Sequence, residues 1–244
     1  MKRPSQRRPG LDVRRALRAA RELVQNPDDL PKVFTVIESL SGGTMSHIRR
    51  RLERSEGGRR LLRDQPEIVD HLLDRAHLAA LPEGTLGRAY LAFVEREGIS
   101  AEGIRDAASQ GESGDRMFDG VEAYVHRRMR DTHDLWHAAI GYGGDILGEV
   151  ALLAFTLAQT RNPAIGLLVG VGLVKTIGSP VARATILEGF RRGREAAWLP
   201  EQEWESMLEL PLDEVRRRLG LGAPPVYVPV TSAELRAERA AAAA

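Results

Sequence analysis

The sequence predicts an all-α protein, a single-domain bundle of many helices. Apolar residues return every three or four positions in most segments, which is the period of an amphipathic helix. Residues typical of helix starts and ends stand between these segments, and we find no convincing alternation of apolar and polar residues that would indicate strands. The length of 244 residues suits one large domain. We expect residues 1–230 to form it and residues 231–244 to be a polar, Ala-rich tail.

The first half of the chain contains four expected helices, identified by apolar spacing. They cover residues 13–24, 33–40, 59–63 and 86–93. Residues 26–29 (Asn-Pro-Asp-Asp) separate the first two, Gly57 and Gly58 precede the third, and Thr85 is placed to cap the fourth. Residues 107–118 are rich in Gly, Ser and Asp, which indicates a polar loop.

The second half is more apolar. Its expected helices cover residues 121–137, 146–160, 185–198 and 211–219. The second of these is apolar on nearly all sides from Val150 to Ala158, which predicts burial. Gly220 ends the last helix, and residues 224–229, with three prolines, should lie extended on the surface. Residues 231–234 (Thr-Ser-Ala-Glu) resemble a capping box.

Composition excludes several kinds of site. The chain has no cysteine, so disulfides, thiolate metal sites, iron–sulfur clusters and a cysteine nucleophile are ruled out. Net charge is +1, yet residues 1–60 carry 15 Lys/Arg against 7 Asp/Glu. This basic end would suit phosphates or an anionic membrane surface, or it is simply a solvated helix face. We expect no nucleic-acid partner.

No segment has the features of a secretory signal or a membrane span. The basic residues at the start are not followed by an apolar core. The longest nearly apolar stretch, residues 164–174, has 11 residues, whereas a spanning helix needs about 20. We therefore expect a cytoplasmic protein that touches a membrane from one side if at all.

One group of residues indicates a metal site. His133 and His137 are four positions apart and therefore share one face of the expected helix. Val121, Val125 and Met129 lie on the same face, so the imidazoles should point inward. Asp134 lies on the flank of this face, and Glu149 follows His137 after 11 intervening residues.

The segment between the histidines and Glu149 predicts a tight helix hairpin. Residues 141–144 (Gly-Tyr-Gly-Gly) must break the first helix, and Asp145 can cap the second. His137 then lies one turn before the break and Glu149 about one turn after it, and residues equidistant from such a turn meet. The resulting nitrogen and oxygen donors suit zinc, iron or manganese. A bound ion would lower the pKa of a water or polarise a carboxylate or phenolate.

Two other interpretations of these residues remain open. The imidazoles and carboxylates can form a hydrogen-bonded polar cluster in the core without any metal. The second interpretation is a zinc peptidase, because the His-Glu-x-x-His motif of these enzymes has the same histidine spacing. Here Asp134 replaces the glutamate base, and its carboxylate is one methylene shorter, so it would reach a water poorly.

These residues also resemble a known family. The run from Arg130 to His137 (Arg-Asp-Thr-His-Asp-Leu-Trp-His) with Glu149 is similar to the His-Asp-x-x-His, eleven residues, Glu signature of the coenzyme Q (ubiquinone) biosynthesis protein four family. Further segments at residues 58–66, 81–90, 210–216 and 224–225 resemble family segments. The resemblance covers about residues 30–230, and the combination is more specific than the histidine motif alone.

The resemblance implies an all-α, often dimeric protein at the membrane where ubiquinone is made. It implies a divalent metal, zinc first and otherwise iron, manganese or magnesium, held by His133, Asp134, His137 and Glu149, which would also carry catalysis. The implied reaction removes the carboxylate at ring carbon one of a polyprenyl-benzoate intermediate and hydroxylates that carbon. The absence of an organelle-targeting presequence suggests a bacterial member, peripheral on the inner face of the membrane.

The family is also regarded as an organiser of other ubiquinone biosynthesis enzymes. An enzyme and a non-catalytic module that binds a prenylated benzoate or quinone lipid are therefore both open. Residues 150–158 and 164–174 flank the metal loop and would line an apolar groove for the tail, or they are core. Six residues are candidates for contacts with the substrate ring, tail or acidic groups: Tyr90, Arg130, Trp136, Tyr142, Phe155 and Lys175.

Overall fold

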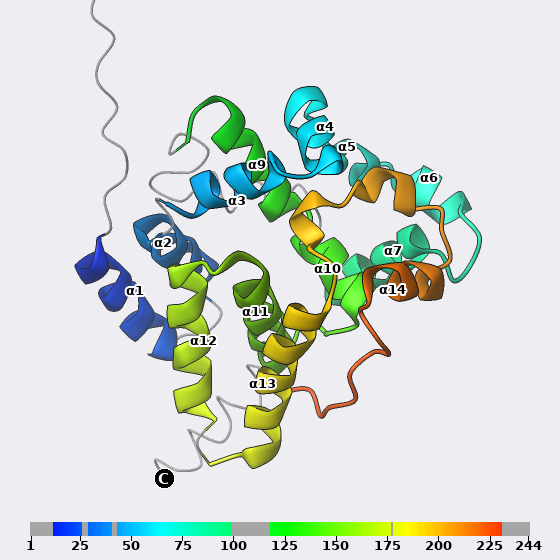
Figure 1. Cartoon of the computed structure of the whole chain (residues 1–244). Helices are drawn as coiled ribbons and strands as arrows, with labels where there is room; N and C mark the ends of the chain where they lie inside the picture. Colours follow the sequence, from blue (N-terminus) through cyan, green and yellow to red (C-terminus); the bar gives the residue numbers. More distant parts are fainter. Residues whose placement is uncertain (1–11, 26–28, 41–42, 99–117, 177, 231–244) are drawn as a thin grey trace, which may run out of the picture.

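The computed structural model describes residues 12–25, 29–40, 43–98, 118–176 and 178–230 (Figure 1). The described residues are organised almost entirely in helices, and the one strand-like pairing among them is an isolated bridge between Thr85 and Pro211. The predicted all-α class is therefore confirmed. Within the described part of the chain, no helix is both long enough and apolar enough to cross a membrane.

The elements follow one another through short connections. In chain order they are α1 (Val13–Gln25), α2 (Leu30–Leu40), α3 (Thr44–Leu52), α4 (Glu56–Asp64), α5 (Ile68–Leu73), α6 (Arg75–Ala80), α7 (Leu86–Glu97), α9 (Gly120–Asp131), α10 (His133–Ile140), α11 (Ile146–Thr160), α12 (Pro163–Lys175), α13 (Pro180–Glu195), the 3₁₀ turns η2 (Leu199–Glu201) and η3 (Trp204–Met207), and α14 (Leu212–Leu219).

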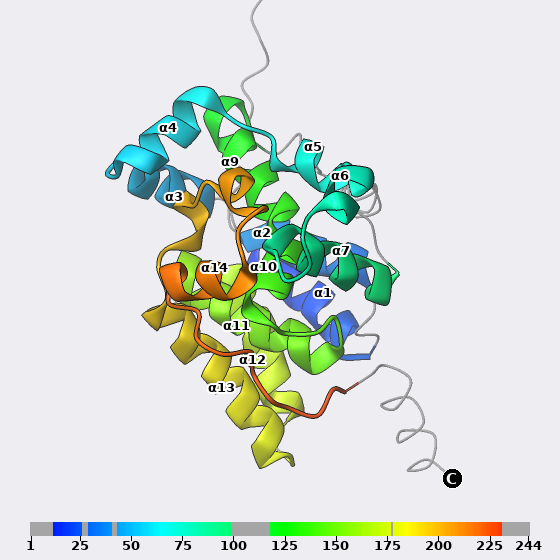
Figure 2. The same cartoon turned by 90° about the vertical axis from the view of Figure 1, so that its right-hand side faces the viewer.

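Helix α11 is the centre of the architecture. It packs most extensively against α13 and also against α12, while α1 and α2 pair with each other and cover α12 (Figures 1 and 2). Close backbone approach explains the α11–α13 contact, because a methyl group on Gly189 or Gly193 would fall under 3.0 Å from the backbone of α11. A separate apolar core joins α7, α10, α11 and α14, and the histidine-bearing helix α10 lies within it.

The start of α11 follows the prediction to the residue. Asp145 caps it, with Oδ1 accepting from the backbone N–H groups of Leu147 (3.1 Å) and Gly148 (3.2 Å). This helix is buried along most of its length, as its apolar residues predict. The predicted cap at Thr85 and the helix end at Gly220, in the left-handed conformation, are also confirmed.

Some predicted boundaries are wrong. The expected helix over residues 121–137 is divided at Thr132 into α9 and α10 and continues to Ile140. Thr132 bonds back through Oγ1 to the carbonyl of Arg128 (2.8 Å), a contact that bends helices. The helix expected at residues 185–198 runs over Pro180–Glu195. It begins five residues earlier, where Ser179 caps it, and it ends before Ala196, which is extended.

The sequence pattern also missed short helices. Helices α3, α5 and α6 were not expected, and α4 begins at Glu56 with Ser55 as its cap, so both predicted breakers lie inside it. Gly58 is accommodated there because it packs directly on the backbone of Leu52, where no side chain fits. The capping box at residues 231–234, and the loop at residues 107–118 apart from its last residue, lie outside the described residues.

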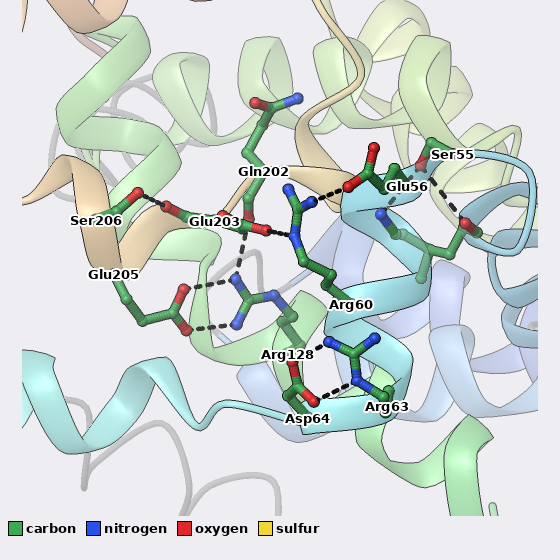
Figure 3. Close-up of polar contacts among 12 residues, drawn as sticks. Ser55, Glu56, Arg60, Arg63, Asp64, Arg128, Gln202, Glu203, Glu205 and Ser206 are labelled. Atoms are coloured by element: carbon green, nitrogen blue, oxygen red, sulfur yellow. Dashed lines mark hydrogen bonds and ion pairs between the residues drawn. The ribbon is translucent and has the colours of Figure 1, made fainter.

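A buried ion pair ties α9 to the segment before α14 (Figure 3). The Arg128 guanidinium donates to both carboxylate oxygens of Glu205, at 2.6 and 2.9 Å, and also to the carbonyls of Pro66 and Gln202. The Arg128 side chain is only 6% exposed. This bidentate contact fixes the helix that leads directly into the histidines.

Candidate metal centre

Three of the four predicted ligands converge. His133 is the first residue of α10, His137 lies one turn later on the same face, and Glu149 is in the first turn of α11. The Nε2 atom of His137 is 3.3 Å from Glu149 Oε1, and Nε2 of His133 is 3.8 Å from Glu149 Oε2. The three potential ligand atoms lie within 4.8 Å of one another. The helix hairpin predicted from the glycine-rich turn therefore exists.

The other ring nitrogen of each histidine defines which atom is available for a metal. His137 Nδ1 is 3.1 Å from the carbonyl oxygen of Tyr142. A carbonyl only accepts, so Nδ1 carries the hydrogen and Nε2 of the neutral ring presents a lone pair. His133 Nδ1 is 3.2 Å from Asp134 Oδ1, and this contact likewise leaves Nε2 of His133 as the nitrogen available for a metal.

This arrangement fits a cation between the ligands. His137 Nε2 is buried and makes no hydrogen bond, although a carboxylate oxygen of Glu149 is 3.3 Å away. A lone pair and a carboxylate at that distance repel each other unless a proton or a metal ion lies between them. Two imidazoles and a carboxylate are donors that zinc, iron and manganese accept.

Asp134 has a different position from the other three. Its Oδ1 contacts His133, whereas Oδ2 is buried and makes no hydrogen bond with any described residue. A carboxylate behind a ligand histidine is a common arrangement at metal centres, where it fixes the ring and raises its basicity. The structure thus shows Asp134 orienting His133, and its predicted role as a fourth ligand stays a prediction.

The charges of the site reinforce one another. Burial lowers the pKa of His133, but the hydrogen bond to Asp134 and the charges of Glu149 and Asp134 outweigh it and raise the pKa to about 9. Burial raises the pKa of Glu149, yet the nearby His137 and His133 lower it overall. The site is also open to solvent on one side, since the side chains of Glu149 and His133 are 41% and 33% exposed.

Phe93 is a site residue that the sequence did not reveal. Its ring stacks on His137 with centroids 5.0 Å apart and planes 14° from parallel. The guanidinium of Arg96, one turn later on α7, lies 5.4 Å from the centroid of Phe93. The apolar stripe over residues 86–93 was the only sequence signal, and it indicated core rather than a contact with a metal ligand.

The turn between the helices is built from closely packed backbone. Gly141 ends α10 with a φ of +95°, a conformation that L-residues rarely adopt. The hydroxyl of Tyr227, from an extended segment near residue 230, accepts from Gly143 N at 2.9 Å and donates to Asp145 Oδ2 at 2.6 Å. The turn therefore depends on a residue more than 80 positions away in the sequence.

The six candidate substrate residues differ in burial and in their contacts. Four aromatic side chains are 2% exposed or less and belong to the core that surrounds α10: Tyr90, Trp136, Tyr142 and Phe155. Arg130 pairs with Asp131 at 2.8 Å, and Lys175 is exposed at the end of α12. Tyr142 contacts His137 through its carbonyl oxygen. The apolar groove and these contacts stay predictions.

The fold and the site define an all-α protein whose helix hairpin presents two imidazoles and a carboxylate to one point. The profile of the family described as coenzyme Q (ubiquinone) biosynthesis protein Coq4 matches residues 13–225. The chain belongs to this family, as the signature over residues 133–149 predicted.

Known relatives agree with this membership. The mitochondrial ubiquinone biosynthesis protein coq4 of Talaromyces stipitatus is 34% identical over 177 residues, which are 70% of this chain and 58% of the relative. That of Aspergillus fumigatus is 35% identical over 172 residues, 69% of this chain and 57% of the relative. The chain thus spans less than two thirds of the length of these relatives. The expected bacterial origin is not borne out by them, since both are fungal.

A crystal structure of a protein assigned to ubiquinone biosynthesis from Nostoc punctiforme has the same fold. It superimposes with a TM-score of 0.63 over 88% of this chain and 100% of that chain, at 22% sequence identity. At this level of identity the likeness concerns the arrangement of the helices alone.

Proposed function

We propose that this protein acts in ubiquinone biosynthesis as a metal-dependent enzyme. The reaction is the loss of the carboxylate at ring carbon one of a prenylated hydroxybenzoate, with hydroxylation of that carbon. The observation that carries the proposal is the pair of imidazole Nε2 atoms facing the Glu149 carboxylate at a partly exposed point. Family membership supports the pathway.

A bound divalent ion would supply positive charge that binds the phenolate or carboxylate of the substrate and withdraws electrons from it. The chain's own residues prepare this point. Tyr142 and Phe93 hold His137 in one orientation, and Asp134 holds His133. Glu149 faces the solvent-accessible side, so a substrate can approach without displacing the core.

Replacing the carboxylate by a hydroxyl is a two-electron oxidation that releases carbon dioxide. Zinc has no redox chemistry, so dioxygen is the proposed oxidant and source of the new oxygen. One oxygen atom enters the hydroxyl group and the other leaves as water, which takes two electrons and two protons from an external reductant. Zinc is the first candidate for the ion, with iron, manganese and magnesium as alternatives.

The proposal places the protein at the inner face of a membrane, as a homodimer that works with other ubiquinone biosynthesis enzymes. A prenylated substrate resides in the bilayer, which makes a surface-bound enzyme the simplest arrangement. Four large apolar side chains on the outside of α12 and α13 are exposed and would suit such a surface: Val174, Val181, Leu187 and Phe190.

The second candidate function is a non-catalytic module that presents a prenylated lipid to partner enzymes. The burial of the four aromatic candidates favours it, because these side chains do not form a ready ring-binding surface beside the ligands. In that case the ion would be structural or would anchor the head group.

The test measures carbon dioxide release and bound metal together. Protein loaded separately with zinc, iron(II) or manganese is given a prenylated hydroxybenzoate with a labelled carboxylate in the presence of dioxygen and a two-electron reductant. We expect turnover by the wild type and by the control His71→Ala, whose side chain is exposed on α5, and at least 100-fold loss of both metal and turnover in His137→Ala. Turnover by the metal-free protein would refute metal-dependent catalysis. Lipid binding without carbon dioxide would favour the presenting module.

A further inference from the structure

An extended segment, residues 221–230, crosses the outside of the metal hairpin, and we refer to it as the strap. It leaves α14 and runs past α11 (Figure 2). At its start, Arg192 donates to the strap carbonyls at positions 221 and 223, at 2.8 and 2.9 Å. At its end, Val230 N donates to Asp145 Oδ1, and the Val230 carbonyl accepts from Ile146 N, both at 2.9 Å. The strap is therefore anchored on both sides of the hairpin.

In the middle of the strap, the side chain of Tyr227 points inward. Val226 and Val228 are exposed, and the alternation of an extended chain turns Tyr227 between them toward the protein. The Tyr227 hydroxyl accepts from Gly143 N and donates to Asp145 Oδ2. A single hydroxyl thus joins the two halves of the turn.

Each of these two contacts leads to a metal ligand. On one side, Gly143 follows Tyr142, whose carbonyl holds His137 Nδ1. On the other side, Asp145 caps α11, and Glu149 lies in the first turn of that helix. The distance between His137 and Glu149 therefore depends on two hydrogen bonds made by one strap residue.

We propose that Tyr227 is a positioning residue that sets the geometry of the metal ligands from the strap. The inference rests on the proposed metal binding. Because one hydroxyl makes both hydrogen bonds, Tyr227→Phe removes both without changing the volume of the ring. The expected effect is a 10- to 100-fold weaker affinity for zinc, the range found when groups that orient metal ligands are lost.

The experiment measures zinc affinity by competition with a chelator, so that no enzymatic activity is needed. The variants are Tyr227→Phe, His137→Ala and the matched control Tyr124→Phe. Tyr124 is a buried tyrosine whose hydroxyl donates a hydrogen bond, but its partner is the carbonyl of Pro66 (3.3 Å), and its ring belongs to a different apolar cluster. We expect wild-type affinity in the control and weakened affinity in Tyr227→Phe.

The outcomes separate the two proposals. If wild type and His137→Ala bind zinc equally, the proposed metal site is wrong. If the wild type binds zinc through His137 and Tyr227→Phe stays within twofold of it, the positioning role alone is overturned. An equal loss in both tyrosine variants would assign the effect to general stability and would also overturn it.

A double-mutant comparison tests the route. Asp145→Asn keeps one oxygen as a cap but removes the acceptor that Tyr227 uses. If Tyr227 acts through Asp145, the double variant should bind zinc no more weakly than the weaker single variant. Losses that multiply would contradict this route.

Discussion

The glycine at position 148 provides a demanding test of the hairpin. It is the fourth residue after the turn and directly precedes Glu149. A methyl group there would fall under 3.0 Å from the carbonyl oxygen of Gly143 and from the hydroxyl of Tyr227, whereas ordinary contacts begin near 3.4 Å. Gly148→Ala therefore forces the turn and the strap apart.

The expected cost follows from three contributions. Alanine gains about 1 kcal/mol over glycine in a helix interior. Overpacking against a backbone oxygen costs about 1–3 kcal/mol, and each lost Tyr227 hydrogen bond costs roughly 1 kcal/mol. The net loss is about 3 kcal/mol, which lowers the melting temperature of a chain of this size by roughly 6–12 °C.

A matched variant makes the test specific. Gly170 in α12 has nothing within 4 Å of the position of an added methyl group, so Gly170→Ala should stabilise the protein by about 0.5–1 kcal/mol. Urea unfolding of the metal-free proteins compares the two, and a zinc titration follows the site. If Gly148→Ala were as stable as Gly170→Ala, the close packing of the turn in this structure would be refuted.

The remaining predictions concern the charges. The raised pKa of His133, about 9 in the metal-free protein, means that zinc competes with a proton, so zinc affinity should fall about tenfold per pH unit from pH 9 to pH 7. Because the pKa of His133 is higher in the folded than in the unfolded chain, protonation of His133 stabilises the metal-free fold. This stabilisation is complete below pH 6.5 and is lost as pH rises through 9. Asp134→Asn should move both dependences to lower pH, and unchanged profiles would contradict this. Glu205→Ala leaves the buried Arg128 unpaired and should lower the free energy of unfolding in urea by about 3 kcal/mol. Arg63→Ala removes an exposed guanidinium and should not move the urea midpoint. Equal urea midpoints for the two variants would refute the comparison.

Much of the fold was predictable because helices are local. The bounds of α11 follow from a capping aspartate and a continuous apolar run, and α14 follows from Gly220. Prediction failed where a neighbour outside the helix decided the outcome. Gly57 and Gly58 are typical breakers, yet they lie inside α4 because the backbone of Leu52 packs against Gly58.

The candidate site was likewise predictable where it depends on local geometry. Histidines at a spacing of four must share a face, and a short turn must bring Glu149 opposite them. Phe93 and Tyr227 were missed because their contacts join segments that are far apart in sequence. The aromatic candidates were chosen for their chemistry, and the structure buries them in the core.

Residue spacing was enough to establish the helical class, the pairing of two imidazoles on one face and the family. These depend on residue spacing within one helix or across one short turn, which the backbone geometry dictates. Three contacts became visible only in the folded protein: Asp134 orients His133, Phe93 stacks on His137, and the strap closes the hairpin. Such contacts arise from how separate segments pack, and no local pattern of residues specifies that packing.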